Sequence, residues 1–148
     1  MSPSPPAPVK VAVIGSRAWR DEGVIESHLT RLYDNNLTLW IVSGGAVGAD
    51  SIAEDWARKR GVSRTIICPN YHSAAVRRRA PLERNEQIAA ECDWMLAFMD
   101  GETPGTVHAI KCALRLGKTV WVVDGAGRRK RWRMVEGDAG PVDEAEVG

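Results

Sequence analysis

The segment SGGAVGAD (residues 43–50) is the stretch of this sequence best suited to hold a ligand. Its small residues are Ser43, Gly44, Gly45, Gly48 and Ala49. The paired glycines let the backbone turn tightly and approach a bound molecule closely. Bare residues at the start of the following helix leave free N–H groups, which favour an anion together with the helix dipole. Asp50 could cap that helix or accept a hydrogen bond from a ribose hydroxyl. The alternative is a packing turn without a ligand.

The segment DGETPGT (residues 100–106) is the second candidate. Pro104 fixes one backbone dihedral and Gly105 frees the next, which shapes a turn. Thr103 and Thr106 place hydroxyls at the start of a helix, where they suit phosphate oxygens or cap the helix. We expect the backbone amides of both glycine segments to hold a phosphate.

Other side chains near these turns can add contacts to a phosphate or a sugar. Gly15 and Ser16 follow an apolar run, and Arg17 beside them can offer a bidentate contact to phosphate. Arg84 and Asn85 lie near the start of a later helix, from which a long cation can reach the same crevice. Ordinary solvated arginines are the alternative reading.

The sequence contains no convincing catalytic set. Asp100 and Glu102 could act as acid or base, with Arg84 assisting, or they could simply solvate their loop. The three cysteines and three histidines are scattered without the spacing of metal ligands, so we expect no metal site and no required cofactor. The cysteines are expected to be small buried apolar residues.

Strand and helix patterns alternate along the chain. Apolar, β-branched runs predict strands over 10–15, 39–45, 64–69, 93–101 and 118–125, and helical periodicity predicts helices over 21–35, 48–61, 81–92 and 103–117. This alternation predicts the α/β class, with a single Rossmann-like three-layer domain and a parallel sheet of about five strands. Ligands in such folds bind outside the carboxyl ends of the strands, where the candidate segments fall.

Length and charge narrow the function classes. The chain has 148 residues, which fits one domain, and 20 Lys+Arg against 19 Asp+Glu give a net charge of +1. A balanced chain has no bulk electrostatic reason to bind nucleic acid or anionic membranes. The longest strongly apolar run, residues 94–99, is far shorter than the roughly 20 residues that span a bilayer. We therefore expect a cytoplasmic protein with neither nucleic acid nor membrane as a partner.

The ends of the chain differ in composition from its middle. Residues 1–9 are expected to form a disordered arm, residues 10–125 the nucleotide-binding domain, and residues 126–148 a flexible charged tail. The basic run RRKRWR (128–133) is more typical of a solvated tail than of a nucleic-acid patch.

An ordered set of motifs resembles the SLOG superfamily, in particular its YspA/YpsA-related branch. The motifs are KVAVIGSR, WIVSGGAVGADSIAEDWA, ERNEQIA, CDWMLAFMDGETPGTVHAIKCA and LGKTVWVV, within residues 10–123. The superfamily includes the LONELY GUY phosphoribohydrolases and the DNA-processing protein DprA. The resemblance implies a Rossmann-like domain that binds nucleotides or nucleotide-derived ligands, and by analogy a homodimer.

The resemblance also assigns individual positions. Gly44, Gly45 and Gly48 match the first glycine motif, and Gly105 and Thr106 match the GT of the second. Arg84 matches the arginine that LONELY GUY enzymes place over their substrate. In those enzymes the second motif is PGGxGTxxE, whereas here it is shortened to TPGT and Ala109 replaces the glutamate expected to assist glycosidic cleavage.

The leading hypothesis is therefore a ligand-binding or sensor domain for a phosphorylated nucleoside or its derivative. The alternative is a nucleotide N-glycosidase similar to the nucleoside-monophosphate phosphoribohydrolases. A third hypothesis, nucleic-acid binding similar to that of DprA, has less support from the sequence.

Overall fold

The computed structural model describes residues 7–35, 38–72, 79–101 and 103–142. The strands are β1 (Val9–Gly15), β2 (Leu39–Ser43), β3 (Ser63–Ile66), β4 (Trp94–Phe98), β5 (Thr119–Val123), β6 (Arg129–Val135) and β7 (Asp138–Pro141). The helices are α1 (Glu22–Asp34), α2 (Ala49–Arg60), α3 (Ala80–Glu91) and α4 (Pro104–Arg115). No helix in these residues is long and apolar enough to cross a membrane.

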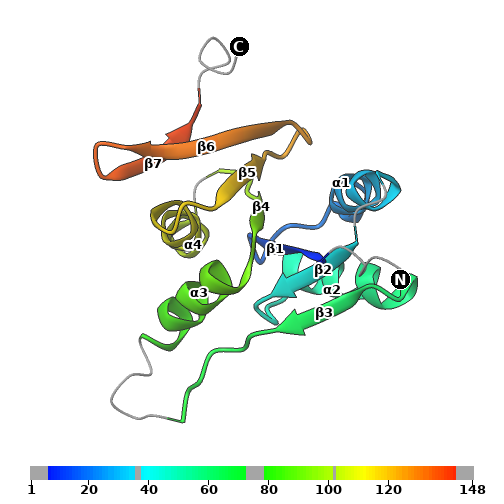
Figure 1. Ribbon diagram of the computed structural model, residues 1–148. Coiled ribbons are helices and arrows are strands. Elements are labelled where there is room, and N and C mark those ends of the chain that lie inside the picture. The colour runs from blue at the N-terminus through cyan, green and yellow to red at the C-terminus, as the bar shows by residue number, and fades with distance from the viewer. Residues whose placement is uncertain (1–6, 36–37, 73–78, 102, 143–148) are drawn as a thin grey trace, which may run out of the picture.

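The strands form one sheet in the order β3-β2-β1-β4-β5-β6-β7 (Figure 1). The first five pair in parallel, as the alternating pattern predicted. β1 lies between β2 and β4, so the strand order reverses next to it. At its carboxyl end Gly15 is in register with Phe98 of β4. The α/β class and the Rossmann-like topology are confirmed.

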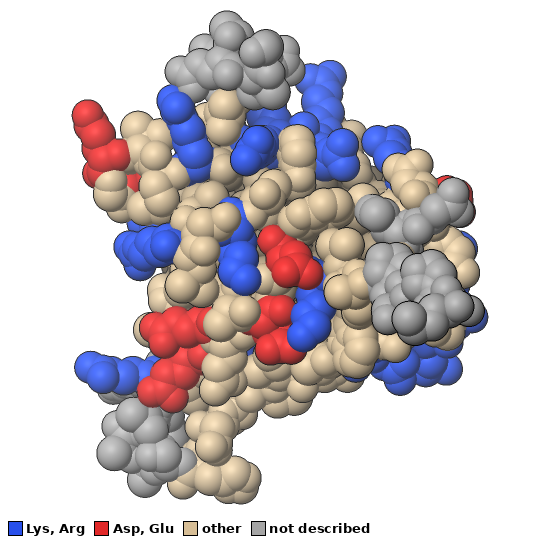
Figure 2. All heavy atoms as spheres, in the orientation of Figure 1, with Lys and Arg blue, Asp and Glu red and all other residues tan. Residues whose placement is uncertain are grey.

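The predicted strand count of about five is wrong, because β6 and β7 extend the sheet by an antiparallel hairpin. These strands lie in the region expected to be a charged tail. Glu136 (φ 50°) and Gly137 (φ 84°) form the two-residue turn between them, with positive φ at both positions as a type I′ hairpin requires. Most of β6 is exposed and basic, and Figure 2 shows Lys and Arg side chains gathered at this end of the molecule.

Helices cover both faces of the sheet and give the three predicted layers. Ile25, Leu29 and Trp56 of α1 and α2 pack with Val13 and Phe98 on one face. On the opposite face, α3 and α4 pack through Ile88, Ala109, Ile110 and Ala113 against side chains that include Ile14, Met95 and Val122. Because both faces are buried, the central strands need the continuous apolar runs seen in the sequence.

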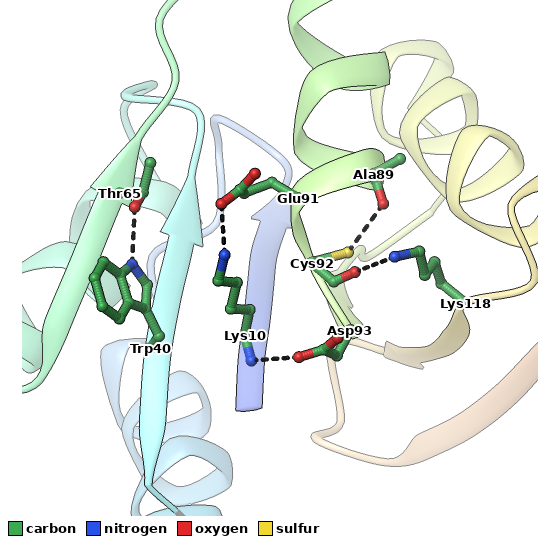
Figure 3. A network of polar contacts seen from close by, with 8 residues as sticks. All are labelled: Lys10, Trp40, Thr65, Ala89, Glu91, Cys92, Asp93 and Lys118. Atoms are coloured by element: carbon green, nitrogen blue, oxygen red, sulfur yellow. Dashed lines mark hydrogen bonds and ion pairs between the residues drawn. The ribbon is translucent and has the colours of Figure 1, made fainter. Parts of the chain in front are cut away.

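Polar contacts fix the amino ends of the central strands, opposite the edge where ligands are expected (Figure 3). The Lys10 backbone N–H donates to the Asp93 carboxylate at 2.9 Å, and its ammonium pairs with Glu91 at 2.7 Å. The Lys118 ammonium donates to the Cys92 carbonyl at the end of α3 at 2.6 Å, where a cation suits the helix dipole. The network joins α3 to β1 and β5 and is structural.

Cysteine exposure separates the three thiols. Cys92 and Cys112 are buried, as predicted, but Cys68 is exposed just beyond β3. Burial raises the pKa of Cys92 to about 11 and also raises that of Cys112. Since the thiolate is the reactive form, we expect a disulfide reagent at pH 8 to modify Cys68 rapidly and the other two only on unfolding. Cys68→Ser should remove the fast phase, and a fast phase that survives this change would contradict the burial order.

Candidate functional site

A cleft of about 430 Å³ opens at the carboxyl edge of the sheet, where the strand order reverses between β1 and β4. This is the position at which open α/β sheets bind ligands. The loops after β1, β2 and β4 and the first turns of α3 and α4 form its walls. Segments far apart in the sequence therefore meet at one place.

The cleft brings together most of the predicted site residues. Those that line it are Gly15, Ser16, Arg17, Asp50, Arg84, Asn85, Thr103, Gly105 and Thr106. Those that do not line it are Ser43, Gly44, Gly45, Gly48, Ala49 and Pro104. The cleft wall thus contains Asp50 of the first segment and Thr103 and Thr106 of the second, whereas the glycines of the first segment do not line it.

The Asp50 carboxylate already occupies the amides of the first glycine segment. Its Oδ2 accepts hydrogen bonds from the N–H of Gly44 at 2.9 Å and of Ala46 at 3.4 Å. The expectation that this segment's amides all face a phosphate therefore needs revision, because Gly44 and Ala46 bind an anion from the chain itself. Asp50 is 5% exposed and lines the cleft wall.

Arg84 and Asn85 connect the two glycine segments across the cleft. Arg84 Nη1 donates to the Gly44 carbonyl at 2.6 Å, and Arg84 Nε donates to Asn85 Oδ1 at 3.1 Å. Asn85 Nδ2 in turn donates to the Gly105 carbonyl at 3.2 Å and lies 3.2 Å from His108 Nδ1. The guanidinium is therefore held in a fixed orientation at the cleft wall. Sequence spacing placed Arg84 near the cleft but did not reveal these partners.

The start of α4 offers unused hydrogen-bonding groups. Among the described residues, buried Thr103 Oγ1 has no hydrogen-bond partner, and Thr103 does not cap the helix through its side chain. A β-carbon added at Gly105 would meet no atom within 4 Å, so neither packing nor a positive φ requires glycine there. Glycine near a helix start costs stability relative to alanine. Close approach of a ligand to the backbone would explain why residue 105 is a glycine.

Gly48 has a structural role in the contact between α2 and the loop after β1. Its φ is 86°, and an added β-carbon would lie 2.6 Å from the Ser16 carbonyl oxygen and 2.8 Å from that of Arg17. The start of α2 therefore presses against the loop after β1 and sets the position of Ser16 and Arg17 in the cleft.

Of the two candidate acids of the second segment, Asp100 does not line the cleft. Asp100 lines a separate pocket of about 270 Å³ with Ser16, Trp19 and Gly125. Its carboxyl lies so close to Gly125 that a β-carbon there would be 2.6 Å away. The structure therefore places the Asp100 carboxyl beside Gly125, in a pocket that adjoins the cleft at Ser16 and Ala18, and not in the cleft itself. Glu102 lies outside the described residues.

Several apolar residues of the cleft were not predicted. They are Ile14, Ala18, Ala46, Pro81, Leu82, Ile88 and Ala109. Nothing in the sequence distinguishes Ile14 and Ile88 from core residues, whereas Ala109 stands out only as the replacement of a glutamate in the related motif. Pro81 and Leu82 lie in the first turn of α3, the helix that carries Arg84, and this position is the feature of the sequence that could have placed them at the cleft. A lining that combines polar and apolar side chains suits a ligand with a charged group and a flat apolar part.

Burial raises the pKa of Asp50 from its ordinary value of 3.8 to about 6, against the opposing effect of the Gly44 and Ala46 amides and of Arg84. The folded chain therefore binds this proton more tightly than the unfolded chain. The free energy of unfolding falls as pH rises through the interval from about 4 to 6, by about 3 kcal/mol.

We expect Asp50→Asn to remove this dependence, since an amide oxygen can still accept from Gly44 but carries no titrating proton. The difference in unfolding free energy between variant and wild type, measured with urea at pH 4 and pH 7.5, should shift by about 3 kcal/mol in favour of the variant at the higher pH. If the free energy of unfolding changed with pH equally in Asp50→Asn and the wild type, the raised pKa of Asp50 would be contradicted.

Chemically, the site can bind an anion and an adjoining apolar ring. The cations Arg17 and Arg84 and the α4 start supply the positive end. In the part of the chain that the structure describes, no group of three or more His, Cys, Asp or Glu side chains could hold a metal ion.

A family model and a curated protein both match this chain. A family model described as the YspA, cpYpsA-related SLOG family matches residues 9–73. The Gene 61 protein of Mycobacterium phage D29 is 35% identical over 116 residues, covering 73% of this chain and 90% of that protein.

Solved structures show the same fold. DprA from Streptococcus pneumoniae matches 80% of this chain and 51% of its own, with a TM-score of 0.63 and 24% identity. DprA from Helicobacter pylori, described for its single-stranded DNA binding mode, matches 78% of this chain and 65% of its own, with a TM-score of 0.60 and 23% sequence identity. TM1055 matches 76% of this chain and 72% of its own, with a TM-score of 0.60 and 17% sequence identity. This chain therefore spans about half of the pneumococcal protein. The DprA neighbours do not support the expectation that nucleic acid is no partner.

Proposed function

This chain belongs to the YspA, cpYpsA-related SLOG family, and we propose that it binds a nucleotide or a nucleotide-derived phosphorylated ligand in the cleft between β1 and β4. The phosphate lies at the start of α4, near Arg17 and Arg84. The base lies against apolar lining residues such as Leu82 and Ile88. The domain serves to sense or hold this ligand.

The observation that carries this proposal is the unused polar surface at the α4 start. The first glycine segment already binds Asp50, whereas Thr103 Oγ1 is buried without a partner beside Gly105, whose missing side chain leaves open space. Burying an unpaired hydroxyl costs free energy, and a phosphate oxygen at this position would accept its hydrogen bond. An anion there also meets the positive end of the helix dipole.

The test is native mass spectrometry of the purified chain with a panel of nucleoside monophosphates, cyclic nucleotides, NAD and ADP-ribose. We expect one adduct of unchanged ligand mass per chain, and a homodimer as the assembly. Gly105→Val should abolish the adduct because its branched side chain fills the open space at the α4 start. Gly105→Ala is the matched control for helix propensity, expected to stabilise the fold by about 1 kcal/mol. No adduct with any member of the panel would overturn the proposal.

One observation favours a second candidate function, cleavage of the N-glycosidic bond of a nucleotide. Among the described residues, Asp50 brings a carboxyl group to the cleft, and its pKa of about 6 leaves it partly protonated near neutral pH. Asp50 would give its proton to the base nitrogen as the bond to C1′ breaks. Water would add its oxygen to C1′ and return a proton to the carboxylate.

Hydrolysis predicts free base and ribose phosphate after hours of incubation. Asp50→Asn should then stop base release while the adduct of intact nucleotide remains. An unchanged ligand mass with the wild-type chain would leave binding alone as the function of the cleft.

A further inference from the structure

The exposed face of β6 presents a row of arginines that the cleft does not use. Arg129 and Arg131 are exposed, and they alternate with Lys130 and Trp132, of which Trp132 packs against the α4 side of the sheet. Because successive side chains of a strand point to opposite faces, both arginines lie on the other face. In the described part of the chain, neither guanidinium pairs with a carboxylate.

Protection of a sheet edge explains the charge of this row but not its aromatic neighbour. Charged side chains often mark edge strands, where they discourage pairing with other chains. Among the described residues, β7 pairs with Trp132–Val135 of β6, whereas Arg129–Arg131 pair with β5 and lie beyond the β7 ladder. Like charges spaced along one strand face repel each other, and an anionic partner would offset that repulsion.

An aromatic ring lies among these cations. Trp121 of β5 is in register with Arg131, and the Arg129 guanidinium lies 4.6 Å from the Trp121 ring centre. The ring and the stacked guanidinium together make a flat surface beside the charged row. Bases of a single strand stack on such surfaces, and the gain does not depend on their sequence.

The spacing fits an extended polyanion. Residues two apart on a strand are separated by about 6.8 Å, comparable with neighbouring phosphates of an extended single-stranded nucleic acid. We propose that the β6 face, defined by Trp121, Arg129 and Arg131, binds single-stranded nucleic acid through its phosphates and through stacking of a base. The argument uses no residue of the cleft and does not depend on the proposed nucleotide ligand.

The test is fluorescence anisotropy of labelled 20-nucleotide oligothymidine and oligouridine with the full chain over a range of salt. The double variant Arg129→Ala/Arg131→Ala should weaken binding about tenfold or more at low salt. It should also reduce the salt slope by about 1.4, because two phosphate contacts are lost. Trp121→Leu should weaken binding without changing that slope.

The matched control is Arg58→Ala/Lys59→Ala, which removes the same charge from the exposed surface of α2. Equal loss of affinity in the two double variants would overturn the proposal, as would equal affinity for a duplex of the same length. Binding to phosphatidylserine vesicles in place of the oligonucleotides would assign the face to membranes. Thermal melting of each variant separates loss of the fold from loss of the surface, and the preference between thymidine and uridine strands distinguishes DNA from RNA.

Discussion

Replacing Gly48 with alanine is expected to lower the free energy of unfolding by about 3 kcal/mol. The residue has φ 86°, where an L side chain is strained, and its new β-carbon would lie 2.6 and 2.8 Å from the backbone oxygens of Ser16 and Arg17. Backbone atoms cannot rotate away as a flexible side chain can. Denaturation with urea, followed by circular dichroism, measures the change.

Gly61→Ala is the matched control. Gly61 also has positive φ, at 68°, but an added β-carbon would meet nothing within 4 Å. Its substitution should cost only the backbone strain, about 1 kcal/mol. The difference between the two variants isolates the contact between α2 and the loop after β1. If Gly48→Ala cost no more than Gly61→Ala, that contact would have no energetic importance.

Arg84→Ala is expected to weaken binding of the nucleotide ligand by about 10- to 100-fold, the range for loss of charge-assisted hydrogen bonds. The same change removes the contact to the Gly44 carbonyl and frees the first glycine segment. It should also raise the pKa of Asp50 further, since the charge of Arg84 lowers it. Isothermal titration with the ligand identified by mass spectrometry measures the affinity.

Arg84→Lys separates charge from geometry. A single ammonium cannot reproduce the planar set of donors that contacts both Gly44 and Asn85, so we expect lysine to restore little of the affinity. Arg115→Ala, on the exposed end of α4, is the control for loss of one positive charge. Full affinity in Arg84→Ala, with the fold retained, would remove Arg84 from the binding site.

The local sequence was sufficient for the parallel part of the fold. β-branched runs such as KVAVIG and helical periodicity after each of them depend on neighbours a few residues away, so they could be read directly. The glycine and threonine turns, residues 43–50 and 100–106, could be located in the same way, because each follows a recognisable strand. The topology rules for parallel sheets then placed these turns at one edge.

The hairpin of β6 and β7 was not predicted from the sequence. β6 is largely exposed and basic, so its composition does not show the apolar alternation of a half-buried strand. Its partly buried residues, Trp132 and Met134, are too few to reveal the period. The turn uses Glu136 at positive φ, which the usual Asn-Gly signal does not cover.

Local sequence located the segments that meet at the cleft edge, because chain position along a strand or helix is a local property. Which of their residues line the cleft, and what each does there, depends on the tertiary packing. Asp50 fills the amides of Gly44 and Ala46, Arg84 reaches a carbonyl 40 residues away, and Asp100 lies in a different pocket. Such outcomes depend on the direction of a side chain relative to elements distant in the chain, and the packing of the helices on the sheet sets that direction.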